Sequence, residues 1–90
     1  MFKTLEELII TIRKRKKSSV EESYTKKLLN DKNLNVQKVK EEVAELIDSI
    51  EKNSNKVHES ADVLYHLMVL LEANGIKIED VMDELKKRQK

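Results

Sequence analysis

Acidic side chains at helical spacing are the groups of this chain best suited to chemistry. Glu59 and Asp62 are three residues apart in "HESADVLYHLMVLL", residues 58–71, and His66 follows four residues later. Because each residue of a helix advances by about 100°, these three side chains lie within roughly 60° of one another. The rest of this segment is mostly apolar, so carboxylates placed among such residues need a cation or a hydrogen-bond donor.

A second acidic segment, "EEVAE", offers Glu41, Glu42 and Glu45. If the two segments form antiparallel helices, Glu42 and Glu45 can face Glu59 and Asp62. Four converging carboxylates would repel one another unless a cation lies among them, and ligation by oxygen alone suits Mg²⁺ or Mn²⁺. The pattern therefore predicts a divalent metal site. The alternative is an ordinary solvated helix face, because glutamates three or four apart are common there.

Long helices are expected to position these groups. The 90 residues include no proline and a single glycine, Gly75, which favours long helices and few tight turns in one domain, residues 1–90. "NSN" at residues 53–55 separates two apolar-periodic stretches, and so short a break predicts an antiparallel helix pair. The residues expected to face the core from this pair are Val36, Val39, Val43, Leu46 and Ile50, then Val57, Ala61, Leu64, Met68 and Leu71.

Shorter elements flank this pair. Thr4 with Glu7 forms a capping-box pattern, and Ser19 with Glu22 repeats it. The polar stretch "NDKNLN", residues 30–35, is typical of a loop. The expected order is all-α, with helices at residues 4–17, 22–30, 36–52, 56–74 and 76–88.

Composition excludes several classes of protein. The net charge of +1 gives no strong attraction to nucleic acid or to a membrane surface, and the absence of cysteine excludes thiolate sites. No apolar run approaches the roughly 20 residues of a membrane span, and the first ten residues do not resemble a signal peptide. We therefore expect a cytoplasmic protein. A chain this short has a modest core, so we also expect a homodimer.

The motif "EExxE" followed by "ExxD" resembles the metal signature of the all-α nucleoside-triphosphate pyrophosphohydrolases, the MazG-like superfamily. Three further segments resemble the phosphoribosyl-ATP pyrophosphohydrolase family: "SYTKKLL" at 23–29, "ADVLYHLMVLL" at 61–71 and "GIKIEDVMDELKKR" at 75–88. The resemblance implies a four- to five-helix bundle completed by dimerisation. It also implies Mg²⁺-dependent cleavage of phosphoribosyl-ATP between the α and β phosphates, giving phosphoribosyl-AMP and pyrophosphate in the second step of histidine biosynthesis.

The resemblance also implies roles for individual residues. By position, the metal ligands are Glu42, Glu45, Glu59 and Asp62. Glu41 corresponds to the first glutamate of the motif and is expected to support a ligand or to activate water, which makes Glu41, Glu42 and Glu45 the candidate catalytic residues. The expected substrate-binding residues are Arg15, Tyr24, Thr25, Lys27, Lys38 and His66, of which His66 could instead order a metal ligand.

The chain departs from the family pattern at two places. Lys40 stands where family members often have a glycine before the paired glutamates, and "NDKNLN" lacks the glycine common in that loop. Both changes concern the surroundings of the substrate, and the carboxylates are unaffected. Two alternatives to phosphoribosyl-ATP hydrolysis stay open: a MazG-like house-cleaning nucleotide pyrophosphohydrolase, and a non-enzymatic helical interaction module.

Overall fold

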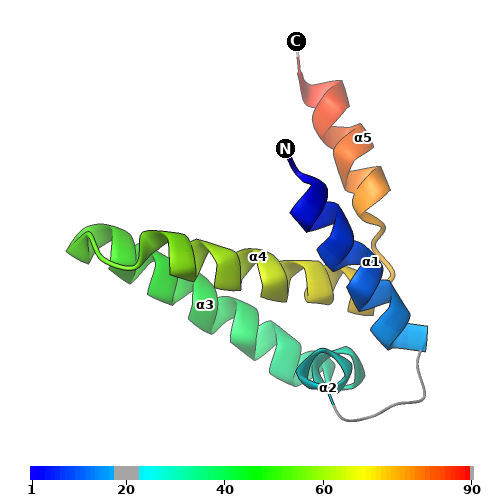
Figure 1. The fold of residues 1–90 in the computed structure, drawn as a ribbon, viewed down its shortest axis with the longest axis horizontal. Helices are drawn as coiled ribbons and strands as arrows, with labels where there is room; N and C mark the ends of the chain where they lie inside the picture. Colours follow the sequence, from blue (N-terminus) through cyan, green and yellow to red (C-terminus); the bar gives the residue numbers. More distant parts are fainter. Residues whose placement is uncertain (18–22, 90) are drawn as a thin grey trace.

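The chain is built from helices, as its composition predicts. The computed structural model describes residues 1–17 and 23–89, and in these ranges Figure 1 shows α1 to α5 and no strand. α3 and α4 lie side by side as a long hairpin, α2 crosses the open end of that hairpin, and α1 and α5 extend away from the end of α4. The helices are α1 (Lys3–Lys17), α2 (Tyr24–Asn30), α3 (Lys32–Lys52), α4 (Lys56–Ala73) and α5 (Ile78–Arg88).

The hairpin of α3 and α4 confirms the predicted antiparallel pair. Its turn contains Asn53 and Asn55, with φ of 56° and 54°. Asparagine adopts this left-handed conformation more readily than most residues. At the other end of α4, Gly75 has a φ of 70°, which suits a glycine just beyond a helix. These local signals explain why the predicted limits of α4 agree with the structure.

The loop predicted for residues 30–35 is wrong. Asp31 alone separates α2 from α3, and its side chain accepts a hydrogen bond from the Leu34 main-chain N–H at 3.1 Å. The asparagines that follow lie inside α3, where Asn35 is fully buried. The polar residues of this segment therefore include a helix cap, Asp31. The chain turns from α2 into α3 at this residue, without the glycine that family members often have here.

Three other predicted helix starts also differ from the structure. α5 begins at Ile78, two residues after its expected start. α1 begins at Lys3, one residue before the threonine expected to cap it. α2 begins at Tyr24, and Ser23 caps it by accepting a hydrogen bond from the Lys26 main-chain N–H at 3.0 Å. The predicted capping box of Ser19 and Glu22 lies outside the described residues.

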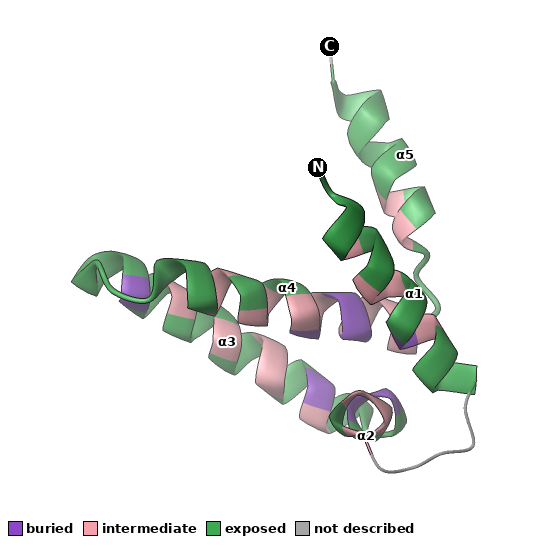
Figure 2. Ribbon diagram, viewed as in Figure 1, coloured by how far each residue is buried: buried purple, intermediate pink, exposed green. Residues whose placement is uncertain are grey.

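The core lies where α1 and α2 pack on α4, and Figure 2 shows most of the buried positions there. Most of the stripe predicted to face the core from α3 is only half-covered or exposed in a single chain, as are several predicted positions of α4. Ile50 is 57% exposed and Val57 is 85% exposed. Periodicity located an apolar face correctly, but most of this face is not covered by the chain's own helices. The buried apolar residues are Ile12, Leu28, Leu29, Met68 and Val69.

Length and hydropathy rule out a helical membrane crossing for the described helices: none is long and apolar enough.

Candidate active site

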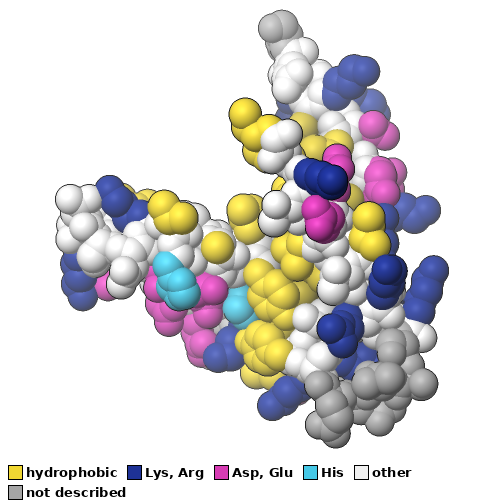
Figure 3. Space-filling view, in the orientation of Figure 1, with side chains coloured by type: hydrophobic (Ala, Val, Ile, Leu, Met, Phe, Trp, Pro, Cys, Tyr) yellow, Lys and Arg dark blue, Asp and Glu magenta, His cyan; other side chains and the backbone are white. Residues whose placement is uncertain are grey.

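The antiparallel pairing of α3 and α4 brings the predicted carboxylates together. Glu42, Glu45 and Glu59 each offer a ligand atom, and these atoms lie within 4.8 Å of one another. Asp62 joins Glu59 in a second, overlapping group, which also contains His58. Figure 3 shows acidic side chains gathered on the hairpin with a histidine beside them. The structure thus brings Glu42, Glu45 and Glu59 together as expected, whereas Asp62 groups with Glu59 alone among the carboxylates. The role of all four as metal ligands stays a prediction.

Burial makes this carboxylate cluster unfavourable without a cation. The Oε2 atoms of Glu42 and Glu59 are buried, and neither has a hydrogen-bond partner among the described residues. Burial, followed by the neighbouring Glu45 carboxylate, raises the pKa of Glu42. Burial, followed by the nearby Glu45 carboxylate, likewise raises the pKa of Glu59. A divalent cation would supply the positive charge that these oxygens lack, so the donor set fits one.

His58 is a neighbour of the cluster that the sequence analysis did not single out. Its Nε2 lies 3.4 Å from Oδ2 of Asp62, one helical turn further along α4. The sequence does carry a signal for this contact. A histidine four residues before a carboxylate shares its helix face, which is the spacing that lets one helix present two metal ligands.

His66 lies beneath the cluster and is 6% exposed. Its Nδ1 is 2.8 Å from the main-chain oxygen of Asp62, and its Nε2 is 2.9 Å from the hydroxyl of Tyr24. A carbonyl oxygen can only accept, so Nδ1 donates and, in the neutral ring, Nε2 accepts from Tyr24. Both nitrogens are engaged, which favours the expected ordering of a metal ligand over contact with phosphate.

Tyr24 and Thr25 connect α2 to α4 beside the cluster. The ring of Tyr24 stacks on that of Tyr65 at 6.2 Å and meets that of His66 edge-on at 5.7 Å. The hydroxyl of Thr25 is hydrogen-bonded to that of Tyr65. Burial raises the pKa of Tyr24, which keeps its hydroxyl protonated as a donor. Tyr65 therefore helps to anchor the segment expected to bind substrate.

Lys38 and Glu41 form an ion pair of 3.4 Å on α3. Glu41 is exposed and lies outside both ligand groups, as its position on the helix predicts. Its role in activating water stays a prediction. The hydrogen bond from Lys38 to Glu41 and the charge of Glu41 raise the pKa of Lys38, so this side chain carries a positive charge beside the cluster.

The other expected substrate-binding residues lie around α2. Lys27 is exposed three residues after Tyr24, on the same side of α2, and Arg15 is exposed in the last turn of α1. Lys26 connects the two helices, because its Nζ donates to the main-chain oxygen of Lys16 at 3.2 Å. The contact of Arg15 and Lys27 with substrate stays a prediction. Lys40, the departure from the family pattern, is exposed on α3.

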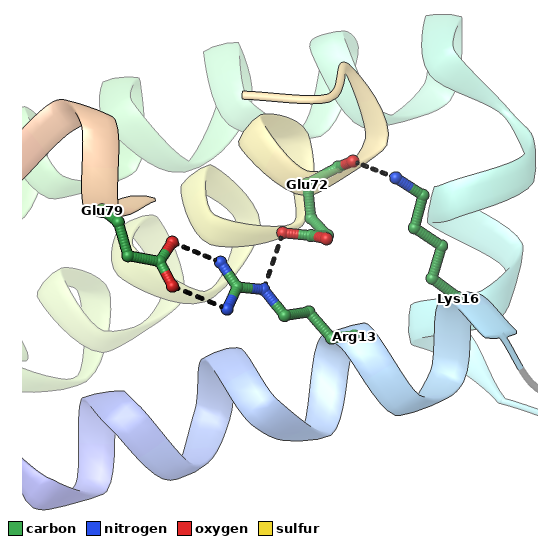
Figure 4. Close-up of polar contacts among 4 residues, drawn as sticks. All are labelled: Arg13, Lys16, Glu72 and Glu79. Atoms are coloured by element: carbon green, nitrogen blue, oxygen red, sulfur yellow. Dashed lines mark hydrogen bonds and ion pairs between the residues drawn. The ribbon is translucent and has the colours of Figure 1, made fainter. Parts of the chain in front are cut away.

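A polar clamp around Arg13 holds the far end of α4. The Arg13 guanidinium donates to both carboxylate oxygens of Glu79, at 2.7 and 3.0 Å, and its Nε donates to Glu72 at 3.3 Å (Figure 4). Lys16 donates to the main-chain oxygen of Glu72 at 2.8 Å. Arg13 lowers the pKa of Glu79 to about 2. The clamp joins α1, α4 and α5, and the sequence analysis did not find it.

Comparisons with known proteins agree with this geometry. Residues 5–89 match the family model described as phosphoribosyl-ATP pyrophosphohydrolase. A phosphoribosyl-ATP pyrophosphatase of Caulobacter sp. (strain K31) is 40% identical, over 99% of this chain and 85% of the relative. A phosphoribosyl-ATP pyrophosphatase of Methanococcoides burtonii is 38% identical, over 94% of this chain and 91% of the relative.

Longer relatives also match. The chloroplastic histidine biosynthesis bifunctional protein of Arabidopsis thaliana is 44% identical over 94% of this chain. The chain spans 33% of that protein and 41% of the bifunctional protein of Pyrococcus furiosus, so it covers less than half of either. The match to the family model and the two pyrophosphatases covered over most of their length show that the chain belongs to the phosphoribosyl-ATP pyrophosphohydrolase family.

Proposed function

We propose that this chain hydrolyses phosphoribosyl-ATP between the α and β phosphates, giving phosphoribosyl-AMP and pyrophosphate. The observation that carries the proposal is the carboxylate cluster, in which Glu42 and Glu59 each bury an oxygen without a partner among the described residues. A solvated helix face would leave those oxygens to water. Family membership supports phosphoribosyl-ATP as the substrate that such a cluster would serve.

Magnesium is the cation we propose for the cluster, with Mn²⁺ as the substitute. Glu42, Glu45, Glu59 and Asp62 would hold it with oxygen alone, which suits a small, hard cation. When bound, such a cation would stabilise the negative charge that develops on the polyphosphate oxygens as the bond between the α and β phosphates breaks. Titration calorimetry with Mg²⁺, free of substrate, tests this proposal directly.

The chain's own cations and hydroxyl groups would orient the substrate. Lys38 lies beside the cluster with a raised pKa, so it can hold phosphate oxygens next to the cation. Tyr24 and Thr25 fix α2 against α4, and Lys27 extends from the same short helix. A basic side chain on this helix suits the additional ribose phosphate that distinguishes phosphoribosyl-ATP from ATP.

One assay separates the candidate functions. Purified protein is mixed with Mg²⁺ and either phosphoribosyl-ATP or ATP, and the released pyrophosphate is measured. Release from phosphoribosyl-ATP alone supports the proposal. Equal release from both indicates a house-cleaning nucleotide pyrophosphohydrolase, and no release from either indicates a non-enzymatic helical module.

We also propose that the chain works as a homodimer. The α3–α4 hairpin leaves large apolar side chains exposed at helical spacing on both of its helices, as an interaction surface would. A second copy of the chain would cover this surface. Light scattering at micromolar concentration gives the molar mass in solution, and a stable monomer would oppose the proposal. The exposed apolar residues of the hairpin are Val36, Val43, Ile47, Ile50, Val57 and Leu64.

The cytoplasmic location expected from the sequence stays a prediction. One relative, the bifunctional protein of Arabidopsis thaliana, is named chloroplastic, so location varies among similar proteins. Fractionation of cells that express the protein, followed by immunodetection, would test it.

A further inference from the structure

We infer that His58 is a nitrogen ligand of the metal site and shifts its preference from Mg²⁺ toward transition-metal cations such as Mn²⁺ and Co²⁺. This inference rests on the proposed function only in taking the carboxylate cluster to hold a divalent cation. His58 would join the four carboxylates of the family motif as a fifth side chain. It would supply a nitrogen ligand where the other four supply oxygen.

The geometry of α4 supports this role. The Nε2 atom of His58 lies 3.4 Å from Oδ2 of Asp62, and a carboxylate oxygen of Glu59 completes a group in which all ligand atoms lie within 4.8 Å of one another. Ligands about 2.1 Å from one cation are separated by roughly 3 Å when adjacent and 4.2 Å when opposite. The three donors can therefore reach a common cation with small side-chain adjustments.

The plainer interpretation is a surface ion pair between His58 and Asp62. His58 has a side chain that is 72% exposed, and pairs four residues apart are common on helices. An ion pair alone does not explain the place of Glu59, whose carboxylate belongs both to the ligand group of His58 and Asp62 and to that of Glu42 and Glu45. Glu59 also buries an oxygen that has no partner among the described residues. A cation shared by His58, Glu59 and Asp62 accounts for both observations.

Exposure also suits a ligand at the open side of the cluster. Glu42 and Glu59 supply the buried oxygens, whereas His58 lies on the solvent side, where a cation enters from water. The imidazole would close the site around an ion already held by oxygen. Its contribution is then selective: imidazole suits transition metals, whereas Mg²⁺ prefers oxygen ligands and retains water.

The experiment compares the native 90-residue chain with His58→Ala and His58→Glu. Titration calorimetry measures the Kd for Mg²⁺, Mn²⁺ and Co²⁺ in each protein, and pulsed electron paramagnetic resonance detects nitrogen coupled to bound Mn²⁺. His58→Glu is the matched control, because it keeps a ligand at this position but replaces nitrogen with oxygen. Circular dichroism verifies that each variant remains helical.

We expect His58→Ala to weaken Mn²⁺ and Co²⁺ binding by about tenfold or more, since even residues that only orient a ligand are worth about 10–100-fold in metal affinity. The Kd for Mg²⁺ should change by less than about threefold, because this ion gains little from imidazole. Native protein should show nitrogen coupling that both variants lose, and His58→Glu should bind Mg²⁺ at least as tightly as the native protein.

Native protein without nitrogen coupling, or His58→Ala with native Mn²⁺ affinity, would overturn the inference. Failure of the proposed function has a different signature: nitrogen coupling would be present while phosphoribosyl-ATP is not hydrolysed. A protein that hydrolyses phosphoribosyl-ATP but shows no coupling would keep the proposed function and reject the role of His58. Absence of binding by all three cations would reject both metal proposals.

Discussion

Two adjacent glutamates of α3 offer the sharpest test of the site. Glu42 lies in the carboxylate cluster, whereas Glu41 is paired with Lys38 at 3.4 Å outside it. Glutamine keeps the shape of glutamate and removes its charge. Glu42→Gln should therefore stabilise the metal-free protein and destroy metal binding and hydrolysis. Glu41→Gln should leave the stability of the metal-free protein and its affinity for metal close to native.

The size of the stabilisation follows from the spacing of the oxygens. Ligand atoms of Glu42 and Glu45 lie within 4.8 Å. At that separation two unit charges repel by about 1 kcal/mol at the dielectric constant of water and by roughly 3.5 kcal/mol at an effective value of 20. Glu45 is exposed, so the lower figure is the better guide. One kcal/mol raises the Tm of a domain this small by about 4–8 °C.

Melting curves with and without Mg²⁺ give the measurement. Without metal, Glu42→Gln should melt several degrees above the native protein. Glu41→Gln should melt at the native temperature or slightly below, because exposed ion pairs contribute little. A saturating cation at 100 times its Kd adds about 2.7 kcal/mol to a folded state that binds it. Native protein and Glu41→Gln should show this rise, and Glu42→Gln should lose it.

Two results would refute the reasoning. If Glu42→Gln melts below the native protein without metal, the carboxylates do not repel one another and the cluster is not strained. If Glu42→Gln still gains stability from Mg²⁺ as the native protein does, this residue does not hold the cation.

The remaining predictions concern catalysis, specificity, assembly and pH. Glu45→Gln and Asp62→Asn should abolish pyrophosphate release while circular dichroism stays helical, and near-native turnover at saturating Mg²⁺ would reject them as ligands. Lys27→Ala and Arg15→Ala should lower kcat/KM for phosphoribosyl-ATP by about tenfold or more and leave Mg²⁺ affinity unchanged, as steady-state kinetics and calorimetry measure; an equal loss on ATP would remove the assigned specificity. Ile50→Asp should yield a folded monomer in light scattering, because this side chain is exposed in a single chain; an unchanged dimer would place the interface elsewhere. Arg13 depresses the pKa of Glu79 from its usual 4.5 to about 2, so the clamp stabilises the fold above pH 4.5 and loses this contribution as pH falls toward 2. The stability difference between native protein and Glu79→Gln, measured by urea unfolding, should therefore vanish over that interval, and a constant difference would contradict the assignment.

Local patterns were sufficient to predict the carboxylate cluster. Glu59 and Asp62 share a helix face because of their spacing alone, and the short break at residues 53–55 allows only an antiparallel return. No long-range information was needed to bring Glu42 and Glu45 opposite them. His58 obeys the same spacing rule, and it could have been found from the sequence.

Contacts between distant residues could not be predicted in this way. Arg13 meets Glu72 and Glu79, which are 59 and 66 positions away, only because α1, α4 and α5 end up at one place. The basic segment to which Arg13 belongs has the composition of any solvated helix end. The polar loop predicted around Asp31 failed for a related reason, since composition does not distinguish a turn from a helix cap.

The apolar stripe of α3 needs a different explanation. Its periodicity correctly predicted a helix with one apolar face, but this face is not buried by the chain's own helices. A helix period in the sequence indicates that one face will be covered, but it does not identify the chain that covers it. Val36, Val43 and Ile50 keep the spacing of core residues and are nevertheless exposed in a single chain. A solvated face would tolerate polar residues at those positions. We therefore interpret the periodicity as burial in an assembly, and the proposed homodimer would explain why a chain of 90 residues keeps an apolar face that its own helices leave open.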